Sequence, residues 1–123
     1  MINWQEIKHF KKEEFECKCG CGLNNINSAL VLMLNDARER ANVPFKINCG
    51  CRCQEHNKEV GGVKDSAHLD GFAVDISTPS DSTRFAVVEA LLNVGFKRVL
   101  LYGSFVHADM DFSKPYPLLK IMK

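Results

Sequence analysis

The chain has 123 residues, of which 46% are hydrophobic and 25% charged, and its 16 basic and 15 acidic residues leave a formal net charge of +1. These values are ordinary for one globular domain, residues 1–123, that buries a single hydrophobic core. Without a basic run, nucleic acid is a poor candidate for a partner, and no apolar stretch reaches the ~18 residues that a membrane span needs.

The N-terminal sequence, Met-Ile-Asn-Trp-Gln-Glu-Ile-Lys, lacks the basic segment and the apolar stretch of a secretory signal peptide. The sequence therefore predicts synthesis in the cytoplasm, and any action outside it would require release or delivery. We also expect the protein to be a monomer.

The first part of the chain predicts a short helix, a loop and a longer helix, in that order. Apolar residues at helical spacing before Phe15 indicate the short helix, and glycines make residues 17–22 a loop. Ser28–Ala41 is the longer helix, because Asn27 or its own first residue can cap it and Pro44 follows its end. Its expected buried face consists of Leu30, Met33, Leu34, Ala37 and Ala41.

The middle of the chain predicts two strands, at 45–49 and 72–77, separated by a helical piece at 54–60. Asp81–Val94 is a second long helix, with Gly95 in the position expected after its last turn. Its expected inward-facing residues are Phe85, Val88, Leu91 and Leu92.

Two further strands are predicted at Arg98–Leu101 and Phe105–Asp111, and the proline-containing tail after Ser113 is expected to pack as irregular chain. Helices and strands are therefore mixed without a regular βαβ repeat. This pattern favours an α+β domain with an antiparallel sheet flanked by helices.

His68, Asp75 and His107 stand out because they lie in otherwise apolar stretches, Ser-Ala-His-Leu-Asp-Gly-Phe-Ala-Val-Asp-Ile and Phe-Val-His-Ala-Asp-Met. Two imidazoles and one carboxylate can hold a catalytic zinc that keeps a fourth position open to water. Such a zinc polarises a carbonyl group and lowers the pKa of its bound water to ~7. A turn at Gly71 must fold the chain back if His68 and Asp75 are to meet.

The alternative for each of these residues alone is structural: two hydrogen-bonded core histidines and a satisfied buried carboxylate. A shared site is favoured, because buried charges are costly without a partner or a metal. An iron site of the two-histidine, one-carboxylate type, starting at His107 and Asp109, is disfavoured because no histidine follows His107.

The segment from Asn48 to Ile76 resembles a known family. Its His-Asn, Val-Gly-Gly and Ser-Ala-His-Leu-Asp-Gly-Phe-Ala-Val-Asp-Ile sequences are similar to the signature of the zinc D-Ala-D-Ala carboxypeptidases. The later Tyr-Gly-Ser-Phe-Val-His-Ala-Asp resembles the Phe-Val-His-Val-Asp segment of that family, and Phe-Glu-Cys-Lys-Cys-Gly-Cys is similar to the start of its small phage and bacterial members. The likeness runs from Phe10 to Met110, with its motif core at about 48–110.

This resemblance implies the α+β fold of the hedgehog signalling domain, with Zn²⁺ as cofactor and His68, Asp75 and His107 as its ligands. It implies that the partner is a peptidoglycan stem peptide, cut by a D,D-carboxypeptidase, a D,D-endopeptidase or an L-alanyl-D-glutamate endopeptidase, as in several phage endolysins. Arg52 takes the position of the family's substrate-orienting arginine, whose guanidinium can bind a carboxylate. Ser66 matches a serine that is expected to contact the substrate.

The general base of the family has no match. Members usually carry a glutamate three residues before the last ligand or a histidine two residues before it, where this chain has Ser104 and Phe105. Asp109 is the nearest replacement for the base, and its other role would be to orient the His107 ring from the same strand face. His56, on a helix surface, is a more distant candidate. The missing base favours one alternative, a non-catalytic zinc-containing binding module of the same fold.

The cysteines form two triplets in which every second residue is a cysteine: Cys17, Cys19 and Cys21, and Cys49, Cys51 and Cys53. The triplets could face each other as reduced thiols, as disulfides joining Cys17 or Cys19 to Cys53, or around a structural metal. Because C-x-C spacing is poor for a tetrahedral zinc, the sequence favours thiols or disulfides over a second metal.

Overall fold

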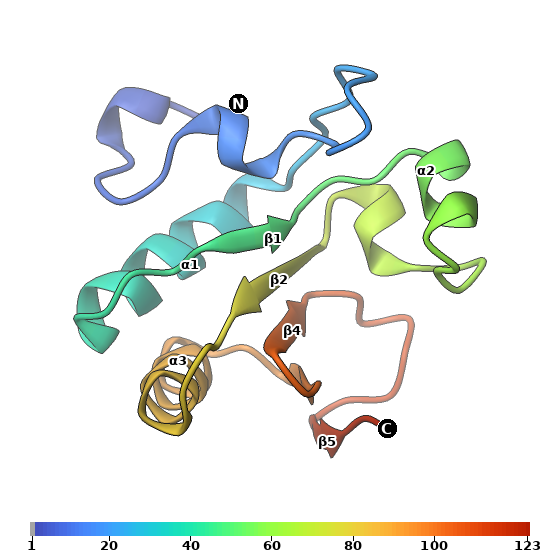
Figure 1. Cartoon of the computed structure of the whole chain (residues 1–123). Helices are drawn as coiled ribbons and strands as arrows, with labels where there is room; N and C mark the ends of the chain where they lie inside the picture. The colour runs from blue at the N-terminus through green and yellow to red at the C-terminus, as the bar shows by residue number, and fades with distance from the viewer. Residues whose placement is uncertain (1) are drawn as a thin grey trace.

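A five-stranded sheet organises residues 2–123, the part of the chain that the computed structural model describes (Figure 1). The strand order is β1-β2-β4-β3-β5, and all neighbours are antiparallel except β3 and β5, which are parallel. The strands are β1 (Ile47–Cys49), β2 (Ala73–Ser77), β3 (Arg98–Leu101), β4 (Phe105–Asp109) and β5 (Leu118–Ile121). The α+β class is therefore confirmed, with one parallel pair at an edge of the sheet.

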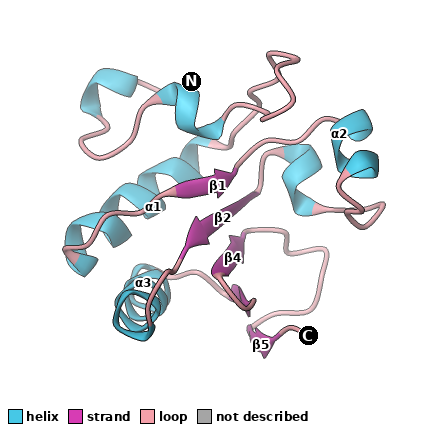
Figure 2. Cartoon of the chain, viewed as in Figure 1, coloured by secondary structure: helices cyan, strands magenta, loops and turns pink. Residues whose placement is uncertain are grey.

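The helices lie around this sheet, and Figure 2 distinguishes them from the strands by colour. They are α1 (Ser28–Ala41), α2 (Gln54–Glu59), α3 (Asp81–Val94) and the 3₁₀ helices η1 (Trp4–Glu6), η2 (Lys12–Phe15) and η3 (Ala67–Asp70). The predicted bounds of α1 and α3 are confirmed, because both ends are fixed locally. Asn27 and Ser80 accept N-terminal N–H groups with their side chains, and Gly95 ends α3 at a φ of 109°.

Three expectations about local structure were wrong. The single N-terminal helix is replaced by η1 and η2, which are separate 3₁₀ turns. The tail after Ser113 is not irregular throughout, because β5 pairs with the outer edge of β3. Leu118 N–H donates to the Lys97 carbonyl at 2.7 Å, and Met122 N–H donates to the Leu101 carbonyl at 2.8 Å. This pairing satisfies backbone groups that an open edge would leave exposed.

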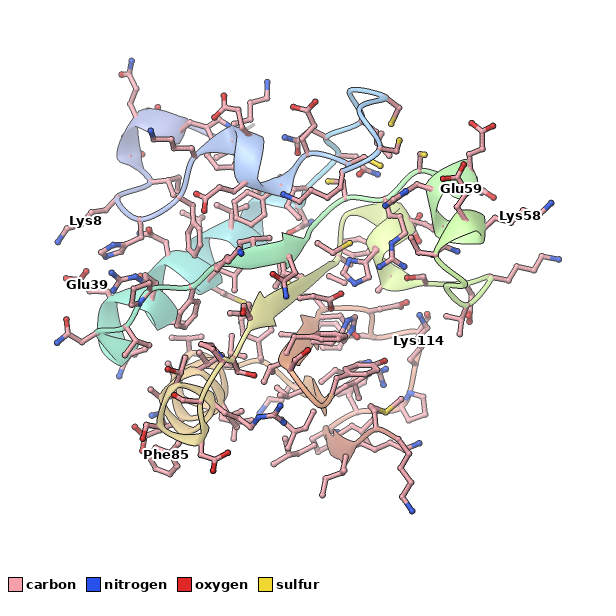
Figure 3. All side chains as sticks on the ribbon, viewed as in Figure 1. Lys8, Glu39, Lys58, Glu59, Phe85 and Lys114 are labelled. Carbon is pink, nitrogen blue, oxygen red and sulfur yellow. The ribbon has the colours of Figure 1, made fainter. Side chains whose placement is uncertain are left out.

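The third wrong expectation concerns the buried face of α3. Phe85 is 67% exposed and points away from the sheet (Figure 3), and Leu92 is 44% exposed. Leu91 is buried as expected, but its buried neighbours are Val87 and Ala90, which form a stripe with it at helical spacing. Apolar residues occur on both sides of α3, and its packing against α1 selects which of them are buried.

The two faces of the sheet have different chemistry. Val74, Ile76 and Val106 are fully buried and share one hydrophobic core with residues of α1 and α3. Successive side chains of a strand point to opposite faces, so Asp75 and His107 point away from that core. The fold therefore turns the polar residues of β2 and β4 onto the face that the long helices leave free. Among residues 2–123, no helix has the length and apolar character to cross a membrane.

Candidate metal centre and active site

His68, Asp75 and His107 meet on the polar face of the sheet. Asp75 and His107 are direct cross-strand partners in the β2–β4 pair. His68 lies on η3, and Gly71 (φ 73°) turns the chain from η3 into β2. A Cβ atom at Gly71 would lie only 2.1 Å from the Asn25 carbonyl oxygen, so both the turn and the packing require glycine. The expected fold-back at this glycine is thus confirmed.

One donor atom of each histidine lies beside the same carboxylate oxygen of Asp75. His68 Nε2 lies 3.2 Å from Asp75 Oδ1, and His107 Nδ1 lies 3.0 Å from the same oxygen. The two rings are edge to face, with centroids 5.2 Å apart. All three residues are at most 9% exposed. Sequence reasoning grouped these residues, and the fold places them together.

The other nitrogen of each ring faces an acceptor. His68 Nδ1 lies 2.7 Å from the Gly50 carbonyl oxygen, and His107 Nε2 lies 2.7 Å from Asp109 Oδ2. A carbonyl or carboxylate oxygen only accepts hydrogen bonds, so these two nitrogens carry N–H groups. In a neutral ring the remaining nitrogen then turns a lone pair toward the Asp75 carboxylate. Lone pairs that converge in this way favour a positive charge between them.

The electrostatics of the three residues point the same way. Burial lowers the pKa of His68, but hydrogen bonding to Asp75 outweighs it and raises the pKa to about 10. The pKa of His107 is likewise raised against the effect of burial by its bonds to Asp109 and Asp75. The pKa of Asp75 is lowered by both imidazoles, although burial acts in the opposite direction. The site therefore holds cationic charge, either as ring protons or as a metal ion that replaces them.

Zinc fits this donor set. Two imidazole nitrogens and one carboxylate oxygen are the protein ligands of many catalytic zinc sites, which leave one position for water. Hydrogen bonds from the outer nitrogens to a carbonyl and a carboxylate are the usual way such ligands are oriented. The fit rests on the chemistry and direction of the donors of His68, Asp75 and His107.

Cys49 is a neighbour of this site that sequence reasoning did not include. Its Sγ lies within 4.8 Å of donor atoms on His68 and Asp75, so these three residues form an alternative candidate ligand set. The sulfur is 3.6 Å from His68 Nδ1, however, and that nitrogen already donates to Gly50. His107 contacts the same carboxylate oxygen as His68 Nε2, so both His107 and Cys49 are neighbours of the His68–Asp75 pair.

Asp109 is held on both of its oxygens. Oδ2 accepts from His107 Nε2, while Oδ1 accepts from Arg98 Nε at 2.9 Å and from the Asp111 N–H at 3.0 Å. Arg98 and Asp109 are cross-strand partners, and Asp109 is only 2% exposed. Burial raises the pKa of Asp109, but the His107 hydrogen bond outweighs it and the pKa is lowered. Of the two roles considered for Asp109, these contacts favour orienting the His107 ring.

Arg52 is fixed beside the site by its neighbours. Its backbone N–H donates to the His68 carbonyl at 3.1 Å, its Nη2 donates to Cys49 Sγ at 3.3 Å, and its Nη1 donates to Asn57 Oδ1 at 2.8 Å. Asn57 in turn donates to the Val63 carbonyl at 2.9 Å. Asn57 was missed as a site residue, and its signal is a polar residue on a short helix just before two glycines.

Ser66 has a local contact that explains its place in the motif. Its Oγ accepts the backbone N–H of His68 at 3.3 Å, which caps η3. Ser66 is 7% exposed and its side chain borders the cleft described next. The residue therefore positions His68 as well as facing the cleft.

A cleft of about 440 Å³ brings the predicted site residues together. Its lining includes the predicted ligands and substrate contacts and the first-choice base, namely Arg52, Ser66, His68, Asp75, His107 and Asp109, but not His56. It also includes Tyr102 and Phe105, whose rings stack at 4.5 Å, and neither was predicted as a site residue. A larger hollow of about 710 Å³ runs along residues 4–14 and is lined by none of the predicted site residues.

A cleft above a mixed sheet, with two imidazoles and a carboxylate converging in it, is the arrangement of a metallopeptidase. The model of the Peptidase M15 family matches residues 8–109, and the chain belongs to this family.

A solved structure has the same fold. The L-Ala D-Glu endopeptidase ChiX of Serratia marcescens aligns with a TM-score of 0.55 and 22% sequence identity. The alignment covers 92% of this chain and 97% of the ChiX chain. No curated protein sequence matches the chain.

Proposed function

We propose that the protein is a zinc-dependent peptidase that hydrolyses peptide bonds in the stem peptides of peptidoglycan. The observation that carries the proposal is that His68 Nε2 and His107 Nδ1 both contact Asp75 Oδ1 in a cleft that also contains Arg52. Membership of the Peptidase M15 family supports it, as does a fold shared with a protein described as an L-Ala D-Glu endopeptidase.

The metal ligands in this proposal are His68, Asp75 and His107. A zinc ion bound there would supply Lewis acidity, polarising the scissile carbonyl and lowering the pKa of water to ~7. The chain's own contribution is orientation. The Gly50 carbonyl and Asp109 hold the ring N–H groups, so that each ligating nitrogen is directed to one point before substrate arrives.

Arg52 is proposed to bind the substrate. Two of its nitrogens each make one hydrogen bond, to Asn57 and to Cys49, which leaves further N–H groups of the planar guanidinium for a ligand. Stem peptides are rich in carboxylates, and a fixed guanidinium is the side chain best suited to grip one. Ser66 borders the same cleft and is proposed as a second substrate contact.

His56 is proposed as the group that takes the proton from water. Ser104 and Phe105 cannot act as a base, and both oxygens of Asp109 are occupied. His56 lines a cavity of about 280 Å³ together with Arg52 and Asp75. Within residues 2–123 its buried Nδ1 makes no hydrogen bond. Imidazole is the side chain that most often serves as a general base.

Digestion of purified peptidoglycan tests the proposal. The wild type, His68→Ala and the matched control His9→Ala are incubated with peptidoglycan, and released fragments are identified by mass spectrometry. His9 is paired with Glu39 and lines neither the cleft nor the smaller cavity, so its variant should behave like wild type. We expect stem-peptide products from the wild type and from His9→Ala, and none from His68→Ala. Identical fragment profiles from all samples, including the no-enzyme blank, would refute a peptidase.

The fragment masses also identify the bond. Release of a terminal D-alanine indicates a D,D-carboxypeptidase, separation of cross-linked stems a D,D-endopeptidase, and separation of L-alanine from the rest of the stem an L-alanyl-D-glutamate endopeptidase. Any of these activities fits an endolysin-like role in degrading the cell wall. A protein that retains zinc and sediments with peptidoglycan but yields no product is instead the non-catalytic binding module. The presence of Ser104 and Phe105 at the positions of the family's general base favours this alternative.

A further inference from the structure

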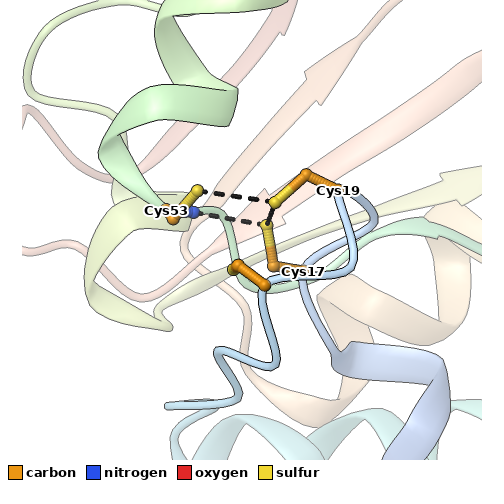
Figure 4. Close-up of side chains that lie close together, drawn as sticks. Cys17, Cys19 and Cys53 are labelled. Carbon is orange, nitrogen blue, oxygen red and sulfur yellow. Dashed lines mark hydrogen bonds between the residues drawn. The ribbon is translucent and has the colours of Figure 1, made fainter.

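A second cluster of metal-binding side chains lies between the loop at residues 17–22 and the start of α2. The Sγ atoms of Cys17, Cys19, Cys21 and Cys53 all lie within 4.8 Å of one another. Those of Cys17 and Cys19 are 3.5 Å apart and those of Cys19 and Cys53 are 3.7 Å apart (Figure 4). Cys19 and Cys53 are 34 residues apart in sequence, so the fold brings them together. The cluster shares no residue with the histidine–aspartate centre.

The spacing of the sulfurs matches a tetrahedral metal site. With Zn–S bonds of about 2.3 Å, the edges of a regular tetrahedron of sulfurs are about 3.8 Å long. A disulfide requires a much shorter separation, about 2.05 Å. Two of the six Sγ–Sγ separations, at 3.5 and 3.7 Å, lie near the tetrahedral value and the others are within 4.8 Å, and all six cysteines of residues 2–123 are free.

The loop backbone explains how C-x-C spacing can produce such a site. In an extended strand, cysteines two residues apart would point along parallel directions. Here Gly20 and Gly22 both have a φ of 86°, which is left-handed, and the Gly20 N–H closes a turn on the Cys17 carbonyl at 3.3 Å. The chain therefore curls, and its sulfurs point to a common centre. The spacing argument against a second metal assumed a backbone that this loop does not have.

Two backbone N–H groups donate hydrogen bonds to sulfurs of the cluster. The Cys53 N–H lies 3.4 Å from Cys17 Sγ, and the His56 N–H lies 3.3 Å from Cys53 Sγ. N–H donors of this kind stabilise a thiolate, which is the form that binds a metal.

We propose that Cys17, Cys19, Cys21 and Cys53 bind a structural zinc ion that joins the 17–22 loop to the start of α2. Four sulfur ligands close the coordination sphere, so the site has no position for substrate or water and differs in kind from the histidine–aspartate centre. Binding exchanges the thiol protons of the four cysteines for one Zn²⁺, with the protons released to solvent. The site lies next to Arg52 in sequence, so it also fixes the backbone that carries this arginine.

Zinc counting tests the proposal without reference to peptidase activity. The parent protein is His68→Ala/His107→Ala, which removes the other centre. The test variant adds Cys19→Ser/Cys21→Ser to this parent, and the control variant adds Cys51→Ser instead. The buried thiol of Cys51 lies outside the cluster and contacts Asn24. Zinc per chain is measured by mass spectrometry after purification in a thiol reductant without chelator. We expect about one zinc in the parent and the control, and close to none in the cysteine double variant.

Either a parent without zinc or equal zinc in all three proteins would overturn the proposal. Intact masses under non-reducing conditions that show a disulfide among the four cysteines of the freshly purified parent would also overturn it. Because the parent lacks the histidine–aspartate centre, failure of the proposed peptidase function would not change these counts.

A spectroscopic measurement covers the case in which the serine variant does not fold. Cys19 and Cys21 are exposed, so their replacement removes no core contact. Addition of Co²⁺ to metal-free parent should produce the intense near-ultraviolet charge-transfer band of a thiolate-bound cobalt ion. Absence of this band in the folded parent contradicts the cysteine site, whatever the behaviour of the variant.

Discussion

The two clusters of candidate metal ligands are built in opposite ways. His68, Asp75 and His107 come from a 3₁₀ turn and from paired strands, where cross-strand register sets their positions. The cysteine cluster of residues 17, 19, 21 and 53 depends on a glycine-rich loop meeting the segment before α2. The first offers nitrogen and oxygen donors inside a cleft, and the second offers only sulfur.

This difference in donors suits the histidine–aspartate centre to catalysis and the cysteine cluster to a structural role. Three protein ligands leave a zinc ion able to accept water, whereas four thiolates satisfy it completely. Arg52 connects the two regions, because its backbone N–H donates to the His68 carbonyl and Cys53 follows it directly. We therefore expect changes at the first cluster to abolish chemistry, and changes at the second to alter structure around Arg52.

The largest effect is expected for His107→Ala. Loss of one ligand should reduce kcat/KM for stem-peptide cleavage by about 10⁴-fold, since metal catalysis contributes several kcal/mol. Zinc should fall by about one ion per chain while the cysteine-bound ion remains. Rates on a synthetic stem peptide and metal analysis measure both. Loss of both ions together would break the comparison, and a rate within tenfold of wild type would exclude His107 as a ligand.

His56→Gln should separate proton transfer from metal binding. A general base contributes about 10²–10⁴-fold, so kcat should fall by about 10³-fold while zinc content stays unchanged. His9→Gln serves as the control, because His9 lies outside the motif core at about 48–110 and pairs with Glu39. If kcat of His56→Gln equals that of this control, another group takes the proton.

Much of the fold could be predicted because its signals are local. Helices α1 and α3 carry a cap, an apolar stripe and a terminating residue within their own sequences. The buried face of α3 and the existence of β5 could not be predicted in the same way. Val87 rather than Phe85 is buried because α1 packs there, and β5 forms because the edge of β3 is open to it.

In the candidate site too, local sequence predicted some features, while others depend on the fold. Residue types and motif spacing grouped His68, Asp75 and His107, because few combinations of buried polar residues suit a metal. Arg98 was missed as a partner of Asp109 because their pairing depends on strand register. The cysteine cluster was undervalued because the positive φ values of Gly20 and Gly22 decide where the sulfurs point.

Asp109→Asn should have an intermediate effect on the first cluster. Asp109 accepts from His107 with one carboxylate oxygen and from Arg98 with the other. An amide is uncharged and has only one oxygen, so it cannot keep both contacts and the His107 ring loses its fixed orientation. Loss of such a supporting contact typically reduces metal affinity by 10- to 100-fold, and we expect about that decrease. Competition with a zinc chelator measures it. Asp111→Asn is the control, and equal affinities for the two variants would show that Asp109 does not orient the ligand.

The smallest effect is expected where Arg52 meets its support. A Cβ atom at Gly62 would lie 2.1 Å from Asn57 Oδ1 and 2.8 Å from Arg52 Nη1, so Gly62→Ala must displace this hydrogen-bonded pair. At Gly103 nothing lies within 4 Å of an added Cβ, which makes Gly103→Ala the matched control. We expect Gly62→Ala to raise KM by about 10-fold, corresponding to about 1.4 kcal/mol of lost substrate binding, with kcat and zinc content unchanged. A fall in kcat at constant KM would instead indicate that Arg52 acts in the transition state, by polarising the scissile carbonyl rather than by holding a carboxylate.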